Sequence, residues 1–379
     1  MKATASDEGL PLYRQIVQEL HAAILRNEYE PGKPFVSQRE VCDRFGVSTA
    51  TAIRALNEMV SQGILVRQRG RGTFVADSVR AAAAEDRPAQ APAIACVLFG
   101  LGSGHVSQML SGVESRCKEL GYRLFLSNSE ASPEQELAAL RRAREDGVSG
   151  IVLFPVEASG NALTIEEIRQ SGIPVVMVDR YLPEIATAVV TADNFAVGYR
   201  VTEKLLQYGH RRIATLWDEI GCTSVRDRLT GHRQALTAHG IAEDANLTVL
   251  RAYHKMPPQA RRMHLSSLLR SDDPPTALLC AHGYVLATVI QDLLEVEPGL
   301  LERIDLASMD DVAPFDIVPF IAAAAGLPSK EMGREAVGLL EESVTTRDPG
   351  LARHIVLPID VREGARAAHA LAQRAAGDD

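Results

Sequence analysis

Apolar residues recur at helical spacing near the start of the chain and predict an amphipathic helix over residues 11–25. Leu12, Ile16, Leu20 and Ile24 form one stripe on that helix. Pro11 suits the first turn because a proline there removes only an N–H that has no intrahelical partner. The stripe is expected to pack against the elements that follow.

Residues 37–63 have the pattern of two further helices joined by a tight turn. Ser37 followed three residues later by Glu40 is a capping-box pattern, which predicts a helix ending at about residue 44. Ser48 is a suitable N-cap for the second helix, which is expected to end at Gly63. Its buried stripe is predicted to be Ala52, Ala55, Leu56 and Met59. Such a succession is a helix-turn-helix pattern.

Two short strands are expected over residues 64–66 and 73–75, with a glycine- and arginine-rich tip between them. Arginines on such a hairpin can contact phosphates or enter a minor groove, and glycine lets the backbone approach closely. A basic hairpin alone is usually a solvated surface, but one that follows a helix-turn-helix predicts a winged unit that binds double-stranded DNA. The residues expected to contact DNA are Ser37, Arg39, Ser48, Thr49, Thr51, Arg54, Arg67, Arg69, Arg71 and Gly72.

From residue 93 onward, continuously apolar segments alternate with amphipathic ones. Strands are expected over residues 94–99, 122–127, 149–155, 173–179, 212–217, 247–253, 276–281 and 304–309. Helices are expected over residues 106–120, 133–145, 165–170, 195–208, 226–239, 261–269 and 286–294. This alternation is typical of parallel sheets covered on both faces. Because it restarts near residue 194, the pattern predicts two α/β lobes with a ligand-binding cleft between them.

Residues 78–92 lack large apolar side chains and contain many alanines and prolines, which suits a linker. The expected organisation is therefore a winged helix-turn-helix domain over residues 1–77, a linker over 78–92, and a two-lobed effector-binding and dimerisation domain over 93–379. The fold class is α/β.

Charge is distributed unevenly along this acidic chain. The net charge is -9, yet residues 36–76 hold six arginines and three acids. Basic charge thus gathers on the predicted DNA-binding unit, while an acidic remainder limits indiscriminate adhesion to DNA. The five widely spaced cysteines are expected to be small buried residues in a reducing compartment. No apolar run is long enough to span a membrane and the N-terminus has no apolar signal core, so a cytoplasmic protein is expected.

The strings PLYRQIVQELHAAIL, SQREV, VSTATAIRAL and GRGTFV together resemble the winged-helix unit of GntR-family transcription regulators. That family usually has arginine directly after the Val-Ser of its recognition helix and again four residues later. This chain has Thr49 and Ile53 at those positions. The resemblance therefore implies that recognition of the DNA base sequence depends instead on Arg39, Thr51, Arg54 and the wing.

The strings GIPVVMVDR, GHRRIA, RLTGHRQAL, PTALLCA and IDLASMDD are similar to the effector domain of LacI/GalR regulators and to periplasmic sugar-binding proteins. The similarity covers residues 93 to about 364. It implies that the chain crosses between the lobes three times, with residues 320–340 returning to the first lobe. It also implies a homodimer that reads an inverted-repeat operator and responds to a sugar or sugar derivative.

Arg180 and Arg228 match positions where the resembled family places guanidinium groups on its ligands. A guanidinium offers several donors in a fixed plane, which suits vicinal hydroxyls, carboxylates or phosphates. The alternative role is a surface arginine or an ion pair between the lobes. The residues expected to bind the effector are Ser103, His105, Phe154, Arg180, Trp217, Arg228, His282 and Asp310.

Two departures from the resembled pattern alter the expected ligand. The family usually has an Asn-Asp pair where this chain has His282 and Gly283, and a glutamine where this chain has Leu327. Losing these polar anchors leaves a site richer in arginine and histidine. The effector is therefore expected to be an anionic carbohydrate, unless the site has lost ligand binding.

The glycines after the first strand of the second domain do not form a dinucleotide-binding motif. Gly100, Gly102 and Gly104 lack the G-x-G-x-x-G spacing, and the second strand has no acid at its end. No cofactor or metal is expected. The sequence predicts a ligand-responsive, sequence-specific transcription regulator, a repressor of carbohydrate-related genes rather than an enzyme. The alternatives are a constitutive DNA-binding dimer and an enzyme with an attached DNA-binding domain.

Overall fold

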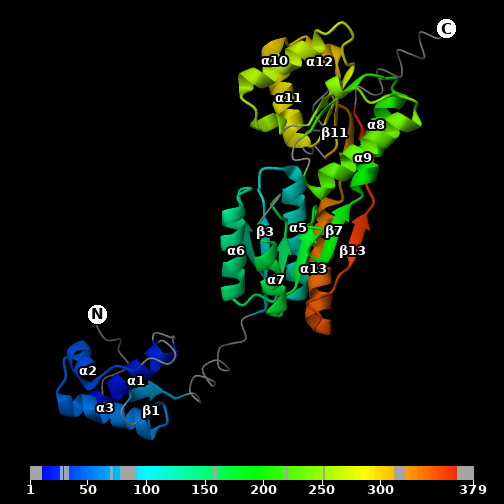
Figure 1. The fold of residues 1–379 in the computed structure, drawn as a ribbon. Coiled ribbons are helices and arrows are strands. Elements are labelled where there is room, and N and C mark those ends of the chain that lie inside the picture. The colour runs from blue at the N-terminus through cyan, green and yellow to red at the C-terminus, as the bar shows by residue number, and fades with distance from the viewer. Residues whose placement is uncertain are drawn as a thin grey trace. The chain divides into compact units, whose positions relative to one another are not determined.

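The computed structural model describes residues 11–25, 29, 34–68, 71–76, 91–156, 160–217, 221–250, 252–310 and 321–364. The chain divides into two compact units, residues 1–90 and 91–379. Figure 1 labels helices and strands of both units where there is room. Among the described residues, no helix is both long and apolar enough to cross a bilayer.

The first unit has the predicted winged helix-turn-helix elements. They are α1 (Leu12–Leu25), α2 (Gln38–Phe45), α3 (Thr49–Ser61) and the antiparallel strands β1 (Leu65–Gln68) and β2 (Gly72–Val75). The predicted stripe of α3 is buried, as are Ile16, Leu20 and Ile24 of α1. The prediction for Leu12 is wrong, because this first residue of α1 lies at the edge of the core and is 54% exposed.

Capping determines where the two helices of the helix-turn-helix begin. The Ser37 hydroxyl accepts from the Glu40 N–H, and the Glu40 carboxylate accepts from the Ser37 N–H at 2.6 Å. Helix α2 ends at Gly46, whose φ of 63° is in the left-handed region that glycine adopts without steric cost. The Ser48 hydroxyl then accepts from the Thr51 N–H and starts α3.

The first lobe of the second unit is a parallel sheet with helices on both faces. Its elements are β3 (Ala93–Leu98), α5 (Gly104–Leu120), β4 (Arg123–Asn128), α6 (Pro133–Glu145), β5 (Gly150–Leu153), α7 (Ala162–Gln170), β6 (Val175–Val178), β7 (Ala188–Ala192), α13 (Ser329–Thr346) and β13 (His354–Leu357). The strand order is β13-β7-β6-β5-β3-β4. Alternate residues of β3 belong to different hydrophobic clusters, one containing α5 and α13 and the other containing α6 and α7.

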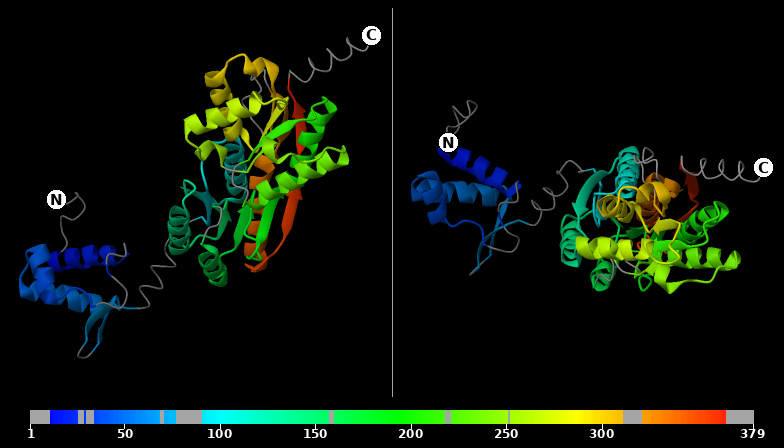
Figure 2. Two further views of the ribbon diagram at one scale, coloured as in Figure 1. Left: turned by 45° about the horizontal axis from the view of Figure 1, so that its top comes forward. Right: turned by 90° about the horizontal axis from the view of Figure 1, so that it is seen from above.

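The second lobe has a six-stranded sheet of order β14-β12-β11-β10-β8-β9. Its elements are α8 (Asn194–Gln207), β8 (Ile213–Leu216), α9 (Thr223–Ala238), η1 (Ala245–Leu247), β9 (Thr248–Val249), η2 (Tyr253–Lys255), α10 (Pro258–Leu269), β10 (Ala277–Cys280), α11 (Gly283–Val296), α12 (Leu300–Arg303), β11 (Asp305–Ser308), β12 (Ile321–Gly326) and β14 (Asp360–Glu363). In the left view of Figure 2, the yellow helices of this lobe lie at one end of the unit, and α6 and α7 of the first lobe lie towards the other end.

The predicted α/β pattern differs from the structure in several details. The strand expected over residues 247–253 is only Thr248–Val249, flanked by the two short helices η1 and η2. Strand β14 pairs antiparallel with β12, so the second sheet is not purely parallel. Strand β7 was not predicted, although its five residues are all buried.

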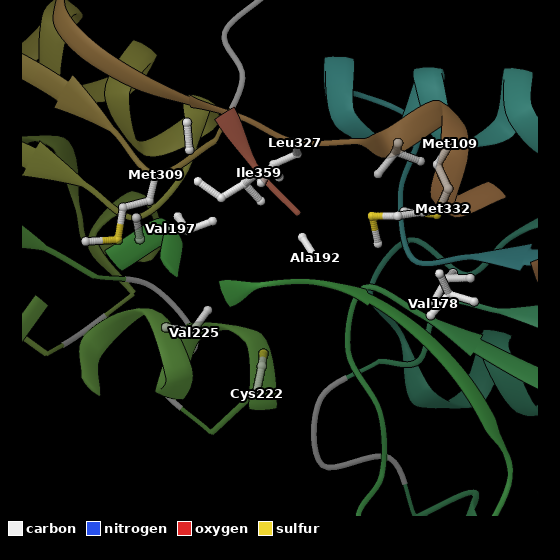
Figure 3. Close-up of a cluster of buried hydrophobic side chains, with 14 of the residues drawn as sticks. Met109, Val178, Ala192, Val197, Cys222, Val225, Met309, Leu327, Met332 and Ile359 are labelled. Atoms are coloured by element: carbon white, nitrogen blue, oxygen red, sulfur yellow. The ribbon is translucent and has the colours of Figure 1, made fainter. Parts of the chain in front are cut away.

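The chain crosses between the lobes three times, as the family resemblance implies. The crossings follow Ala192, Gly326 and Leu357, the last residues of β7, β12 and β13. Residues 321–326 therefore remain in the second lobe, and only the part after them returns to the first. In Figure 3, Ala192, Leu327 and Ile359 lie between the buried side chains of the two lobes. One hydrophobic cluster thus continues through the hinge.

Each lobe packs a pair of long helices through glycine. A Cβ placed on Gly112 of α5 would lie 1.9 Å from the Lys330 carbonyl oxygen of α13. A Cβ on Gly198 of α8 would lie 1.9 Å from the Arg228 carbonyl oxygen of α9. These backbones approach too closely for any side chain at either glycine. The contact between Gly198 and the Arg228 backbone fixes the position at which the Arg228 side chain enters the cleft.

Candidate nucleic-acid interface and effector cavity

The first turn of α3 presents small and polar side chains. Thr49 and Ala50 are exposed. The Ser48 and Thr51 hydroxyl oxygens are 2.9 Å apart, so these two predicted contacts with DNA form a hydrogen bond with each other. The turn is therefore preorganised.

The arginines of the helices differ in how firmly they are held. The Arg39 side chain of α2 is 92% exposed, with its Nε 4.0 Å from the Asp43 carboxylate. The Arg54 guanidinium of α3 lies over the Tyr13 ring, 4.1 Å from the centroid. The stacked Arg54 has already lost part of its conformational entropy, whereas Arg39 has not.

In the described part of the wing, one arginine lies on each side of the tip. Arg67 on β1 donates to the Asn57 side-chain oxygen of α3, which ties the wing to the recognition helix. Arg71 is exposed at the turn, and Gly72 has a φ of 115° that disfavours any other residue. The predicted contact at Arg69 lies outside the described residues.

The two lobes of the second unit enclose a cavity of about 540 Å³. Seven of the eight predicted effector-binding residues line it: Ser103, His105, Phe154, Arg180, Arg228, His282 and Asp310. Gly100 and Gly102 also form part of its wall, at the carboxyl end of β3. Groups separated by more than two hundred positions in sequence thus face one space.

Trp217 is the exception and its predicted role needs correction. The side chain is 1% exposed, its indole N–H donates to the Thr215 hydroxyl at 2.9 Å, and it is not among the residues that line the cavity. Its ring lies beside His232 of α9, inside the hydrophobic cluster. The residue after β8 therefore faces the core of the second lobe and not the cleft.

Arg180 reaches across the cleft from the first lobe. Its guanidinium lies 4.6 Å from the centroid of Phe99 and 4.9 Å from that of Phe154, and Nη1 donates to Cys222 Sγ at 2.8 Å. Cys222 precedes α9 of the second lobe. The aromatic rings hold the guanidinium by cation–π attraction, and the thiol contact joins the two lobes.

Arg228 is the corresponding cation of the second lobe. It is 5% exposed, and α9 carries it to the wall of the cavity. Its Nε donates to the Asn194 side-chain oxygen at 2.8 Å and its Nη1 to the Ala281 carbonyl at 3.0 Å. These neutral acceptors orient the guanidinium without adding a negative charge to it.

A buried ion pair that the sequence did not reveal lies beside the two arginines. His105 Nε2 is 2.9 Å from Asp179 Oδ1, and His105 Nδ1 is 2.7 Å from Ser329 Oγ. Burial alone would raise the pKa of Asp179, but the hydrogen bond with His105 and the charges of Arg228 and Arg180 lower it to about 2. Burial lowers the pKa of His105, yet Asp179 outweighs burial and raises that pKa above its ordinary value.

Asp179 also has an unusual backbone, with a φ of 65°. A residue other than glycine in the left-handed region stores strain and is often found at a binding site. The sequence signal that could have identified Asp179 as a cavity residue was its position at the carboxyl end of a buried strand, directly before Arg180.

Sequence reasoning also missed the rings of His254 and Tyr284, which lie beside the predicted His282 at the second-lobe side of the cavity. His254 lies 5.4 Å from Tyr284 and 6.4 Å from His282, measured between ring centroids. His254 belongs to η2, whose first residue, Tyr253, was the last residue of the predicted strand. Together with the neighbouring Lys255, these rings line the cavity.

Asp310 contributes an acceptor at the end of β11. The residue is 7% exposed, and its Oδ1 has no hydrogen-bond partner in the described part of the chain. Its backbone N–H donates to the Ser308 hydroxyl at 3.3 Å. A buried carboxylate oxygen without a partner carries a desolvation cost that a ligand hydroxyl can relieve.

A winged helix-turn-helix unit, in one chain with two α/β lobes around a cavity that contains charged residues, defines a ligand-responsive DNA-binding transcription regulator. Residues 94–296 match the model of the periplasmic binding protein domain family, and the chain belongs to that family. Residues 12–75 match the model of bacterial regulatory proteins of the gntR family, so the regulator joins a GntR-type DNA-binding unit to a LacI/GalR-like effector domain.

Similar proteins include transcriptional repressors. The arabinose metabolism transcriptional repressor of Geobacillus stearothermophilus is 24% identical over 353 residues, which cover 90% of this chain and 93% of that protein. The HTH-type transcriptional repressor PurR of Haemophilus influenzae strain PittEE is 26% identical over 66% of this chain and 73% of its own. The crystal structure of the transcription regulator CcpA of Lactococcus lactis covers 72% of this chain and 98% of its own, with a TM-score of 0.62 and 20% identity, and shares the fold.

Proposed function

We propose that the protein is a homodimeric repressor whose effector is a small anionic carbohydrate, such as a sugar acid or a sugar phosphate. The seven cavity residues predicted from the sequence would bind this effector, and the arginines and first-turn residues of the winged unit would bind DNA. The protein would act through binding and not through catalysis, at genes of carbohydrate metabolism.

The observation that carries this proposal is the pair of buried arginines in opposite walls of one cavity. Arg180 belongs to the first lobe and Arg228 to the second. Because His105 and Asp179 compensate each other, the remaining lining charges are these two arginines and Lys255 against Glu130 and Asp310. The positive excess favours a ligand with one anionic group, while the Asp310 oxygen favours a hydroxyl donor.

The relatives support the carbohydrate class by name. One is a repressor of arabinose metabolism, and it is similar over nearly the whole of both chains. Another is named HTH-type transcriptional repressor PurR, with no sugar in its name, and the fold alone does not decide the ligand. The charge of the cavity favours the anionic members of the carbohydrate class over neutral sugars.

The dimer and the operator follow from the size of one winged unit. A single unit contacts too few base pairs for genomic specificity, and two copies related by a two-fold axis read an inverted repeat. The proposed organisation is a DNA-binding domain over residues 1–77, a linker over 78–92, and an effector and dimerisation domain over 93–379. Because an operator is chromosomal, we expect the protein to work in the cytoplasm.

Calorimetry on the full chain tests the effector class. Matched neutral sugars, sugar acids and sugar phosphates are titrated into the protein, and an anionic compound is expected to bind with saturation. Arg228→Gln should lower that affinity at least tenfold, because a charge-assisted contact is lost. Arg233→Gln is the control, since this arginine is on the same helix but pairs with Glu243 at 3.0 Å. Binding of neutral sugars alone would contradict the anionic class.

One observation favours a constitutive DNA-binding dimer as the second candidate. The guanidinium groups of Arg180 and Arg228 already donate to protein acceptors, so the protein itself satisfies part of the cavity. If no compound of the panel binds and operator affinity stays constant across it, the constitutive dimer is the better description.

A further inference from the structure

The imidazole of His105 lies between a carboxylate and a hydroxyl group. On one side its Nε2 is 2.9 Å from Asp179 Oδ1, and on the other its Nδ1 is 2.7 Å from Ser329 Oγ. The three residues come from α5, from the end of β6 and from the start of α13. None of them is more than 6% exposed, so water competes little for these hydrogen bonds.

Ser329 has a second hydrogen-bond partner in the hinge. Its Oγ lies 3.4 Å from the carbonyl oxygen of Leu327, to which the hydroxyl can donate. Leu327 follows β12 and precedes α13, so it lies where the chain crosses from the second lobe to the first, between the buried side chains of both (Figure 3). A hydroxyl group has a single proton, so Ser329 donates either to His105 or to Leu327.

The charge of His105 decides between these two acceptors. The pKa of Asp179 is lowered to about 2, so its carboxylate is ionised and only accepts, and Nε2 of His105 carries a proton in both charge states of the ring. In the neutral ring, Nδ1 has a lone pair and accepts from the Ser329 hydroxyl. In the imidazolium, Nδ1 donates to Ser329 Oγ, and the hydroxyl proton then turns to the Leu327 carbonyl.

Charged groups face His105 from several elements. Burial lowers the pKa of His105, but the hydrogen bond and charge of Asp179, with the charge of Asp310 on the β11 side, raise it above its ordinary value against the opposing charge of Arg228. In the effector cavity the other acidic, basic and histidine residues are Glu130, Arg180, His254, Lys255 and His282. In a second cavity, of about 700 Å³, they are Lys330, Glu331, Arg334 and Arg362. Because His105 lines both cavities, protons reach its ring from either one.

We propose that His105 is a proton-dependent switch of the hinge. A proton that binds Nδ1 turns the Ser329 hydroxyl from the imidazole to the Leu327 carbonyl, which adds a hydrogen bond between the start of α13 and the crossing. Loss of that proton removes this bond and loosens the crossing. The regulator thus responds to pH as well as to its effector. The switch acts in the protein without effector, so it goes beyond the proposed function and can fail without contradicting it.

The test is hydrogen exchange of the free full chain, measured by mass spectrometry on peptides that span residues 326–333 and corrected for the intrinsic pH dependence of exchange. Protection of these amides should fall about fivefold as the pH rises from about 6 to about 9, the size expected for one net hydrogen bond. The midpoint of this fall should coincide with the titration of the His105 ring in the NMR spectrum of the same protein.

Two variants break the switch at different points. Ser329→Ala removes the hydroxyl and keeps the His105–Asp179 pair, so protection should stay low across this pH range while the ring of His105 still titrates. His105→Gln keeps a donor for Asp179 but takes up no proton, so it should also abolish the pH dependence. Retained pH dependence in either variant would overturn the proposal, because another group would then carry the effect.

His210→Gln is the matched control. His210 lies between the Asp305 carboxylate and the Thr276 hydroxyl, at 3.0 and 2.9 Å, but neither partner belongs to the crossing. This variant should therefore behave as the wild type. Loss of the pH dependence in His210→Gln would indicate a general effect of histidine titration on stability and would contradict the switch. Constant protection in the wild type while His105 titrates would contradict it as well.

Discussion

The DNA-binding unit and the two-lobed unit differ in how far apart in sequence their interacting residues lie. In the first, the caps of Ser37 and Ser48 join residues three positions apart, and Arg67 bonds to Asn57 ten positions away. In the second, His105 contacts Ser329 across 224 positions and Asp179 across 74.

This difference indicates how far the effect of a single substitution extends through the structure. A change in the DNA-binding unit removes one local contact of modest energy. A change in the two-lobed unit can leave a buried charge unpaired or force two helices apart, because several distant elements meet at one point. The five predictions below test this contrast, from the largest expected effect to the smallest.

Replacing His105 should have the largest effect. His105→Leu leaves the Asp179 carboxylate buried without its partner, which typically costs about 3 kcal/mol of unfolding free energy. Denaturant unfolding of the full chain measures this cost. The double variant His105→Leu/Asp179→Asn should recover more than half of it, because no uncompensated charge remains. If the double variant is as unstable as the single one, the lost packing of His105 is the cause.

The His105–Asp179 pair also predicts the direction in which stability changes with pH. Because the pKa of His105 is raised in the folded state, its stabilisation is fully present below 6.5 and is lost as pH rises through the raised pKa. The lowered pKa of Asp179 acts oppositely, with stabilisation lost as pH falls from 3.8 toward about 2. The stability gap between wild type and His105→Leu should therefore be constant just below pH 6.5 and shrink as the pH rises from 6.5 through the raised pKa of His105. A constant gap would contradict the buried ion pair.

Gly198→Ala should come next, at about 2 kcal/mol of destabilisation, because the added Cβ would lie 1.9 Å from the Arg228 carbonyl oxygen. Gly338→Ala is a matched control in the interior of α13, where a Cβ would meet nothing within 4 Å. There, alanine should stabilise by up to about 1 kcal/mol. Equal effects of the two changes on unfolding free energy would argue against close packing of α8 and α9.

Arg71→Ala should weaken binding to all DNA sequences about tenfold and reduce the salt slope of the binding constant by about one, as expected for one phosphate contact. Fluorescence anisotropy over a range of salt concentrations measures both. Arg44→Ala is the control, because this arginine donates to the Tyr29 hydroxyl at 3.1 Å and is not among the predicted DNA contacts. A change in sequence preference, without a change in slope, would mean that Arg71 reads bases.

Ser48→Ala should have the smallest effect. It removes the acceptor for the Thr51 N–H and should destabilise α3 by about 1 kcal/mol. Hydrogen exchange of the α3 amides in the full chain should accelerate, while amides of the two-lobed unit keep their rates. Faster exchange in both units would show that the effect is not local and would contradict the proposed difference between the two units.

The sequence by itself determined the local architecture. Capping residues fixed the starts of α2 and α3, and helical spacing identified the buried stripe of α3. Continuous apolar runs located most strands, because both faces of these sheets are buried. The length of strand β9 (Thr248–Val249) was overestimated, because an apolar run does not distinguish a strand from short helical turns.

The cavity was predictable only in part. Strand ends and family positions indicated Arg180, Arg228 and Asp310, all of which line it. The tertiary structure decided that Asp179 pairs with His105 and that Trp217 faces the core. It also decided that Arg362 and Lys330 meet at one cavity from different lobes. The physical reason is that hydrogen bonding and hydrophobic periodicity are read over a few neighbouring residues, whereas burial and charge pairing depend on which distant segments fold together.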